Sequence, residues 1–339
     1  MKHRTTRPKH RGTEKRDMAH AASSTDLSHL NAVPLKITVP DHQRGMVAPY
    51  GNDLGHALKF YLVGTGGTGS WLAPHLVRLA RFLRETRQTK VHVTFIDPDV
   101  VEPKNVYRQN FGETEVGGYK AELLALRYAA AWGQNIEVRT APFEKGMVQL
   151  EYQDLGVIVG CVDNAAARRT VAEALDQESQ LHGADALPRL WWLDAGNGID
   201  TGQVLFGAAR NARQLQSAFP FFPDQGFCVN LPAPDLQHPD LLQTQPEPAP
   251  TRETEDNLSC AEMLLTGDQS PSINAMVANL AATYVWRIFA DPKGLTTFAT
   301  YCNLNVLSTR SRFIIPEAIA QVVGKSVKMF KPHEPNALR

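Results

Sequence analysis

Apolar residues recur along this chain in two spacings, one typical of buried strands and one typical of helices. A short apolar run at 59–64 leads into a glycine cluster, and residues 70–85 then have apolar positions at helical spacing. Residues 91–99 form a second apolar run that stops at Asp-Pro-Asp, and residues 120–132 again have helical spacing. The pattern therefore predicts strand, tight turn, helix, strand and helix in this order.

The alternation continues through the middle of the chain. Residues 136–143 and 155–164 are predicted strands, and the second is followed by a predicted helix at 167–177. Strands that alternate with helices indicate a parallel sheet with helices on both faces. Residues 190–198 and 202–210 are joined too tightly for a helical crossover, so we expect antiparallel strands there. The predicted fold class is α/β, with a Rossmann-like, mostly parallel sheet continued by antiparallel strands.

The second half of the chain is less regular. Residues 211–257 lose all periodicity and contain eight prolines among polar residues, which predicts a long loop or mobile insert. Residues 272–291 are the longest helical stretch of this half, and residues 298–313 alternate like one or two late strands.

These patterns divide the chain into five predicted segments. They are a disordered basic tail at 1–28, a nucleotide-binding domain at 29–210, a Pro-rich crossover or insert loop at 211–257, the C-terminal part of the same domain at 258–325, and a tail at 326–339. The first 16 residues contain seven Lys or Arg, which suits an arm on nucleic acid or a solvated tail, or an overlong start before Met18. Without interleaved aromatic residues, a nucleic-acid partner is not expected.

Composition narrows the class of protein. The 35 Lys and Arg balance the 35 Asp and Glu, so net charge does not indicate a partner. No apolar stretch approaches the ~20 residues that cross a bilayer, and no apolar run near residue 1 resembles a secretion signal. The four cysteines, Cys161, Cys228, Cys260 and Cys302, form no C-x-x-C pair. We expect a cytoplasmic protein from a reducing compartment, without a membrane span.

The glycine cluster Gly64, Gly66, Gly67 and Gly69 is the first candidate for chemistry. It fits G-x-G-x-x-G directly after a predicted strand and at the start of a predicted helix. In this context the first glycine allows the tight turn, the second lets a phosphate approach the backbone, and the third lets the helix pack on the strand. Unpaired amides at the helix start favour an anion. The ligand is predicted to be a nucleotide, either NAD or ATP.

Residues downstream favour ATP. Asp97 ends the second strand, where such sheets hold a ribose hydroxyl, and this suits either nucleotide. Asn105, Arg108 and Lys120 follow within 23 residues of Asp97. Single basic residues are usually solvated, but a set of them near a triphosphate balances its charge and stabilises a leaving pyrophosphate. A dehydrogenase needs no such set.

Five motifs then occur in order. They are Gly64 to Ser70, Asp97-Pro98-Asp99, Asn105-Val106-Tyr107-Arg108-Gln109, Val116 to Glu122, and Cys161-Val162-Asp163-Asn164 with Arg168. With these motifs the chain resembles the ThiF family of ubiquitin-activating-like adenylyltransferases, over residues 58–210 and again 258–290. The stretches at 190–207 and the Pro-rich insert resemble in particular its PRTRC-type ThiF-like group, whose members are expected beside small ubiquitin-like and protease-like partners.

The resemblance implies roles for individual residues. Asp97 would hold the ribose, Asn105, Arg108 and Lys120 would contact the phosphates, and Asp163 would hold Mg²⁺ or the phosphate end of ATP. The glycines, Asp99 and Asn164 complete the implied cofactor-binding set. ATP and Mg²⁺ are the implied cofactors, and Asp163 is the implied metal ligand. The partner would be a small ubiquitin-like protein with a C-terminal Gly-Gly tail.

Other family features are partly absent. The sulfur-carrier activators hold zinc with two C-x-x-C pairs that this chain lacks, so no structural zinc is expected. A homodimer is implied, and Arg44 is a candidate for the N-terminal arginine that completes a partner subunit's ATP site. Cys260 lies ahead of the long predicted helix, where related activators carry an acyl-accepting cysteine, although Glu262 works against a low thiol pKa.

Other functions stay open at this point. The chain is predicted to adenylate the tail of a ubiquitin-like protein, with possible thioester transfer to Cys260. The first alternative is adenylation of a small-molecule or tRNA-linked carboxylate, and the second is an NAD-dependent oxidoreductase. A scaffold without activity is the third.

Overall fold

The computed structural model of this chain describes residues 32–41, 46–49, 57–151, 154–182, 187–216, 218–219, 226–244 and 271–330. All of them belong to one compact unit, Ala32–Arg339. The predicted basic tail, Arg44 and Cys260 lie outside the described residues. The predictions made for them, and the five segment boundaries, therefore stay predictions.

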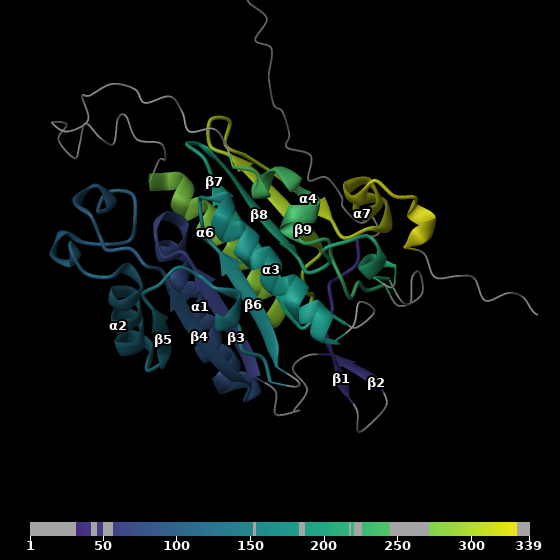
Figure 1. Cartoon of the computed structure of the whole chain (residues 1–339), viewed down its shortest axis with the longest axis horizontal. Helices are drawn as coiled ribbons and strands as arrows, with labels where there is room; N and C mark the ends of the chain where they lie inside the picture. Colours follow the sequence, from purple (N-terminus) through teal and green to yellow (C-terminus); the bar gives the residue numbers. More distant parts are fainter. Residues whose placement is uncertain are drawn as a thin grey trace, which may run out of the picture. The chain divides into compact units, whose positions relative to one another are not determined.

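Eight strands form one mixed sheet in the order β10-β9-β8-β7-β6-β3-β4-β5 (Figure 1). The parallel part consists of β3 (Ala57–Val63), β4 (Lys90–Ile96), β5 (Ile136–Arg139), β6 (Leu155–Gly160) and β7 (Leu190–Asn197). The antiparallel part consists of β8 (Thr201–Gly207), β9 (Thr297–Asn303) and β10 (Ser308–Phe313). The predicted α/β class, with parallel strands continued by antiparallel ones, is confirmed.

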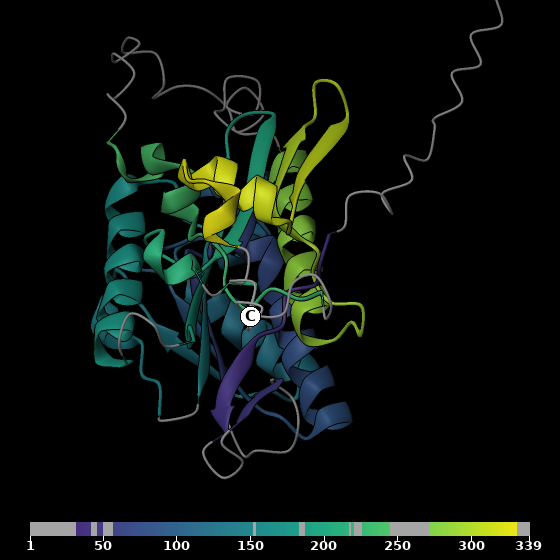
Figure 2. The same cartoon turned by 90° about the vertical axis from the view of Figure 1, so that its right-hand side faces the viewer.

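Helices cover both faces of this sheet. Helix α3 (Ala165–His182) packs on one face, and α1 (Gly67–Arg87), α2 (Lys120–Trp132) and α6 (Pro271–Phe289) pack on the other. Figure 2 shows α3 on one side of the strands and α1 and α6 on the opposite side. The bounds of α2 agree with the helix predicted at 120–132.

Alternate residues of the central strands pack into the hydrophobic layers on the two faces of the sheet. Phe60 and Trp191 belong to the hydrophobic layer beneath α1 and α6, whereas Tyr61 and Trp192 belong to the layer beneath α3. Successive strand side chains point to opposite faces, so each tryptophan of the pair is buried in a different layer. Burial on both faces explains why these strands are continuous apolar runs in the sequence.

Several short elements were not predicted. Strands β1 (Thr38–Asp41) and β2 (Met46–Pro49) form a separate two-stranded sheet. Helices α4 (Pro234–Gln237) and α7 (Pro316–Val323) and the 3₁₀ turn η6 (Pro239–Leu242) lie in the second half. The other 3₁₀ turns are η2 (Pro103–Asn105), η3 (Glu113–Glu115), η4 (Lys145–Met147), η5 (Arg213–Leu215) and η8 (Val327–Met329).

The described part of the predicted loop at 211–257 packs against the fold. Leu231 and Ala233 are buried, and α4 follows them directly. Arg210 ties α4 to α3, because its guanidinium pairs with Asp235 and its Nε lies 3.1 Å from Asp176 Oδ1. Residues 226–244 therefore belong to the packed domain.

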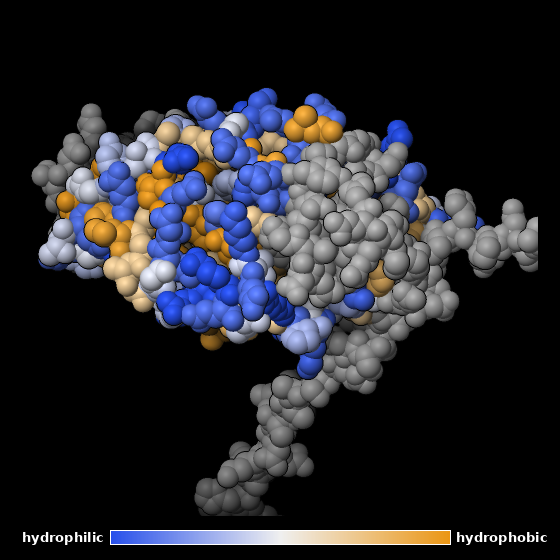
Figure 3. Space-filling model, turned by 90° about the horizontal axis from the view of Figure 1, so that it is seen from below, coloured by the Kyte–Doolittle hydropathy of each residue, from blue (hydrophilic) through white to orange (hydrophobic). Residues whose placement is uncertain are grey.

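No helix in the described part of the chain is both long and apolar enough to span a membrane. On the face shown in Figure 3, hydrophobic residues reach the surface in several groups with hydrophilic residues around them.

Strand β3 lies at a switch point of the topology. The chain passes from β3 to β4 on one side, and later places β6 on the other side of β3. In sheets of this kind ligands bind outside the carboxyl ends of the strands, at the point where the strand order reverses. The segments that follow β3, β4 and β6 are therefore the place to look for a site.

Candidate active site

The glycine turn joins the carboxyl end of β3 to α1. Gly64 has a φ of +85°, and a Cβ built on it would lie 2.6 Å from the carbonyl oxygen of Cys161. A Cβ on Gly69 would collide with the Gly64 carbonyl oxygen, so both positions require glycine. A Cβ on Gly66 would meet only the Gln109 side chain, at 3.7 Å or more. The backbone at Gly66 therefore leaves space for a phosphate to approach.

Asp97 holds this turn in place. Its buried carboxylate accepts hydrogen bonds at Oδ2 from the Thr65 backbone N (2.5 Å) and from Thr65 Oγ1 (3.0 Å). Its Oδ1 accepts a hydrogen bond from the Asp99 backbone N at 2.8 Å. Both oxygens thus bind groups of the protein itself. The ribose contact implied for Asp97 stays a prediction.

Lys120 and Asp99 form an ion pair next to this turn. Lys120 Nζ lies 3.0 Å from Asp99 Oδ2, and the lysine side chain is 7% exposed while that of Asp99 is 64% exposed. The Lys120 backbone N also donates to the Asp99 carbonyl oxygen at 2.9 Å. Because the Asp99 carboxylate is well hydrated, the pair is weak, and a phosphate can compete for the ammonium group.

Arg108 follows a turn that Asn105 stabilises. Asn105 Oδ1 accepts a hydrogen bond from the Glu102 backbone N at 2.9 Å, and its carbonyl oxygen accepts one from the Gln109 N at 2.8 Å. Arg108 Nε and Gln109 Oε1 are buried, and neither makes a hydrogen bond to any described residue. Buried polar atoms normally have partners. Two such unpaired atoms on neighbouring residues, with the Gln109 side chain facing Gly66, therefore point to a polar ligand.

A chain of side-chain hydrogen bonds links the glycine turn to α6. Thr68 Oγ1 donates to Asn197 Oδ1 at 2.8 Å, and Asn197 Nδ2 donates to Asn274 Oδ1 at 3.1 Å. Asn274 Nδ2 donates in turn to the Arg108 carbonyl oxygen at 3.1 Å. Asn274 is fully buried near Gly67. These amides were not among the predicted site residues. The sequence feature that could have indicated Asn274 is a polar residue within the mainly apolar helical stretch at 272–291.

Asp163 and Asn164 follow the carboxyl end of β6. Both side chains are exposed, and Asn164 Nδ2 lies 3.4 Å from Asp163 Oδ1. Asn164 Oδ1 accepts a hydrogen bond from the Ala167 backbone N at 2.8 Å, as a cap of α3 does. Asp163 therefore presents a carboxylate at the same sheet edge as the glycine turn.

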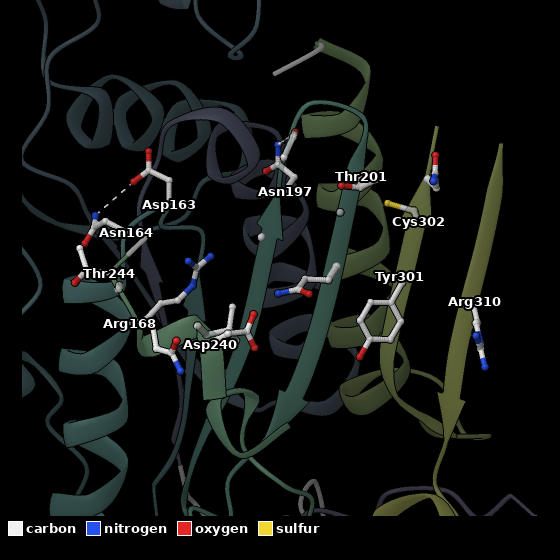
Figure 4. Close-up of a pocket in the computed structure, with 18 of the residues that line it drawn as sticks. Asp163, Asn164, Arg168, Asn197, Thr201, Asp240, Thr244, Tyr301, Cys302 and Arg310 are labelled. Carbon is white, nitrogen blue, oxygen red and sulfur yellow. Dashed lines mark hydrogen bonds between the residues drawn. The ribbon is translucent and has the colours of Figure 1, made fainter. Parts of the chain in front are cut away.

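A cavity of about 850 Å³ begins at Asp163 and extends along the sheet to β10 (Figure 4). Most of the residues that line it have polar side chains, and they include Asn164, Asn197, Gln203, Tyr301, Asn303 and Arg310. Tyr301 is anchored by His238, whose Nε2 lies 2.6 Å from the tyrosine hydroxyl. The cavity thus joins the switch point to the antiparallel part of the sheet.

Arg168, which lines this cavity, forms an ion pair with a buried carboxylate. Arg168 Nε donates to Asp194 Oδ1 at 3.0 Å, and Asp194 is fully buried. Burial raises the pKa of Asp194 above its usual range, and Arg168 opposes this effect. Arg168 was part of the fifth sequence motif, but no function was predicted for it. Asp194 was not among the predicted site residues.

A family model described as "ThiF family" matches residues 48–320 of this chain. The chain belongs to the ThiF family. The matched range includes all predicted site residues, from Gly64 to Cys260. The resemblance inferred from the five motifs is therefore confirmed.

Solved structures similar to this ThiF-family chain are distant in sequence. PaaA is 14% identical with a TM-score of 0.44, and the match covers 76% of this chain and 64% of PaaA. E. coli MccB in a crystal with AMPCPP and MccA is 13% identical, with a TM-score of 0.42 and coverage of 76% and 63%. E. coli MccB with ATP is 15% identical, with a TM-score of 0.42 and coverage of 79% and 67%. The chain thus spans slightly less than two thirds of PaaA. No curated protein sequence matches this chain.

The described cysteines of this ThiF-family chain have thiols whose pKa is raised by burial. Burial raises the pKa of the Cys228 thiol to about 12, and it also raises the pKa of Cys161 and of Cys302. Thiolate is the reactive form, so burial works against an acyl-accepting role for these three cysteines. Cys260, the predicted acceptor, lies outside the described residues.

Metal ligands are sparse in the described residues. Among them, no group of three or more His, Cys, Asp or Glu side chains is placed to hold a metal ion. Asp163 is a single exposed carboxylate, which suits Mg²⁺ only when phosphate oxygens and water supply the remaining ligands.

Proposed function

We propose that this chain transfers AMP from ATP to a carboxylate, and that this is the C-terminal carboxylate of a small ubiquitin-like protein ending in Gly-Gly. The observation that carries the proposal is a pair of buried, unpaired polar atoms, Arg108 Nε and Gln109 Oε1, on neighbouring residues, of which Gln109 faces Gly66 of the glycine turn. Lys120 adds a second positive charge, and Asp163 follows the neighbouring strand. Membership of the ThiF family, whose members are adenylyltransferases, supports the same reaction.

The reaction needs charge stabilisation more than proton transfer. One carboxylate oxygen attacks the α-phosphorus of ATP, and the bond from that phosphorus to the oxygen bridging to the β-phosphate breaks. Negative charge then builds up on the departing pyrophosphate, and no proton has to move. Arg108 and Lys120 are the groups that we assign to this charge, because prearranged donors stabilise a transition state without reorganising. The free amides at the start of α1 favour the phosphates as well.

Asp163 is the residue that we assign to Mg²⁺. A bound Mg²⁺ would neutralise charge on the phosphates of ATP. Asp163 fits this role as an exposed carboxylate at the end of β6, at the edge where the glycine turn lies. Asn164 caps α3 next to it and fixes the direction in which the chain leaves the strand.

The cavity along the sheet is the proposed place for the acyl substrate. Its amide and hydroxyl side chains can donate to and accept from the backbone of an extended peptide. A thioester on Cys260 would follow if its thiolate displaces AMP from the acyl adenylate. A homodimer is part of the same proposal.

A smaller carboxylate is the second candidate. The cavity volume of about 850 Å³ lies within the range of pockets that enclose small molecules, so a small-molecule or tRNA-linked carboxylate also fits. An NAD-dependent oxidoreductase is less favoured, because it gives no role to the unpaired Arg108 or to Lys120.

Exchange of labelled pyrophosphate into ATP tests this proposal. The full chain is assayed with a ubiquitin-like protein ending in Gly-Gly, with its Gly-Gly-deleted form, and with small carboxylic acids. Lys120→Ala should lower the exchange rate on the order of 100-fold to 1000-fold, as the loss of one transition-state donor does.

The matched control is Lys104→Ala, in the same segment. Lys104 is about half exposed and pairs with Glu102 at 2.9 Å, so its loss should leave exchange unchanged. Equal activity of both variants would refute the role of Lys120. Tighter binding of NAD than of ATP would refute adenylation itself.

A further inference from the structure

Positive side chains lie on both sides of the glycine turn. Arg108 and Lys120 follow β4, whereas Arg168 belongs to α3, which follows β6. Strands β4 and β6 flank β3 on opposite sides. The proposed reaction brings together two anions, ATP and a carboxylate, and only the first has been assigned to cationic groups. Among the described residues, Arg168 and Arg310 are the cations that line the cavity, and Arg168 is the less exposed of the two and the one that follows β6.

Arg168 reaches from α3 toward β7, as Figure 4 shows. Its side chain is only 12% exposed and its Nε is used by Asp194, but Nη1 and Nη2 make no hydrogen bond to any described residue. A Cβ on Gly196 would lie 2.9 Å from Arg168 Nη2, so glycine at this position leaves room for the guanidinium group. Gln203 Nε2 lies 3.8 Å from the position of this Gly196 Cβ, so a second donor group is near the guanidinium.

Asp194 is placed to orient this arginine. It is fully buried in β7, and its Oδ2 is buried without a hydrogen-bond partner among the described residues. A buried ion pair is weak evidence for a contribution to stability, since apolar residues of similar size often stabilise a fold equally well. A fixed carboxylate that takes only Nε leaves the Nη groups of Arg168 for the cavity that Arg168 lines, where they can donate charge-assisted hydrogen bonds to one oxygen of a carboxylate.

We infer that Arg168 binds the carboxylate that receives AMP, and that Asp194 is the positioning residue for Arg168. This inference rests on the proposed adenylation. Arg168 donates to one carboxylate oxygen and leaves the other oxygen free to attack the α-phosphorus. Arg168 keeps its proton throughout, so the bonds formed and broken are those of the adenylation step. The cavity that Arg168 lines also contains Asp163, so both reactants meet in one space.

Two measurements test the inference on the full chain. A synthetic hexapeptide ending in Gly-Gly is titrated by calorimetry in its free-carboxylate form and as the C-terminal amide, and ATP is titrated separately. In pyrophosphate exchange, the KM for the carboxylate and the KM for ATP are determined. The wild-type protein should bind the free carboxylate at least tenfold more tightly than the amide.

The variants are chosen so that the fold survives. Removing Arg168 alone would leave Asp194 as an unpaired buried charge, so Arg168→Gln is combined with Asp194→Asn in a double variant. Arg168→Lys and Asp194→Asn are also measured as single variants. Each should raise the KM for the carboxylate tenfold or more and leave the KM for ATP within twofold, with the smallest effect in Arg168→Lys. The control is Arg139→Gln on β5. The Arg139 side chain is 54% exposed, so this variant should change neither the KM for the carboxylate nor the KM for ATP.

The outcomes are distinct. A wild-type protein that binds both peptide forms equally, or neither, overturns the inference. A rise in the KM for ATP instead would assign Arg168 to the phosphates and also overturn it. If the wild type binds ATP but exchanges no pyrophosphate with any carboxylate, the proposed function fails. If exchange is present and the KM for the carboxylate is the same in all variants, only the role of Arg168 fails.

Discussion

Asp97 offers a test of how the nucleotide-binding turn is held together. Replacing it with Ala removes the acceptors of the Thr65 backbone N, of Thr65 Oγ1 and of the Asp99 backbone N. Leaving a buried donor unpaired costs roughly 1–3 kcal/mol. The hydroxyl can rotate to another acceptor, so the two backbone groups dominate, and the free energy of unfolding should fall by about 2–5 kcal/mol.

Thr65→Val separates the parts of this network. It removes only the hydroxyl donor and should lower the free energy of unfolding by about 1 kcal/mol. In the Asp97→Ala background the same change should have almost no effect, because the bond between the two side chains is already gone. The coupling energy of this cycle is therefore about 1 kcal/mol.

Urea unfolding, followed by the fluorescence of the five tryptophans, measures these changes. The KM for ATP is measured in parallel, because a residue that only binds ribose would raise this constant without a change in stability. A loss below about 1 kcal/mol in Asp97→Ala, together with a tenfold rise in the KM for ATP, would refute the positioning role. Asp97 would then be the ribose ligand that the sequence motif implies.

Two further predictions concern ionisable side chains. Burial lowers the pKa of His75 and of His238, so the unfolded chain binds more protons below about pH 6.5, and the free energy of unfolding should fall as the pH drops below that value. Urea unfolding from pH 5 to 8 should show a smaller slope in the His75→Gln, His238→Gln double variant, and an unchanged slope would contradict the assignment. On non-reducing gels with ATP and the ubiquitin-like partner, Cys260→Ala should lose a thiol-sensitive conjugate and keep pyrophosphate exchange. A conjugate that survives in Cys260→Ala but disappears in Cys228→Ala would move the nucleophile to Cys228, whose raised pKa argues against it.

The sequence alone determined the elements of the parallel half and the place of the nucleotide turn. Strands buried on both faces need continuous apolar runs, and helices need apolar positions every three to four residues, so β3, β4, β6 and α2 can be read locally. Gly64 could be assigned from its place in G-x-G-x-x-G between a predicted strand and a predicted helix, where a tight turn needs glycine, and its positive φ agrees with this assignment. The antiparallel turn after β7 followed from the short connection to β8.

The short elements of the second half could not be read in this way. The helix α4 has only four residues, too few to show a period, and it is held by Arg210 through ion pairs to α3 and to α4 itself. Loss of periodicity in the sequence therefore did not mean loss of packing. Leu231 is buried, and its carbonyl oxygen accepts hydrogen bonds from the backbone N of Ala208 and of Ala209, which follow β8 earlier in the chain.

The side-chain pairs of the site were decided by the tertiary structure. Asp194 reads as one polar residue in an apolar strand, and only the pairing of β6 with β7 brings it to Arg168 on α3. Asn274 lies 166 residues from Arg108, and the packing of α6 against α1 joins them. A spacing pattern reports which face of its own element a residue occupies, but a contact between elements depends on strand order and helix packing. The residue types therefore predicted the nucleotide site, whereas the order of strands around β3 determined the partners of Arg168 and Asn274.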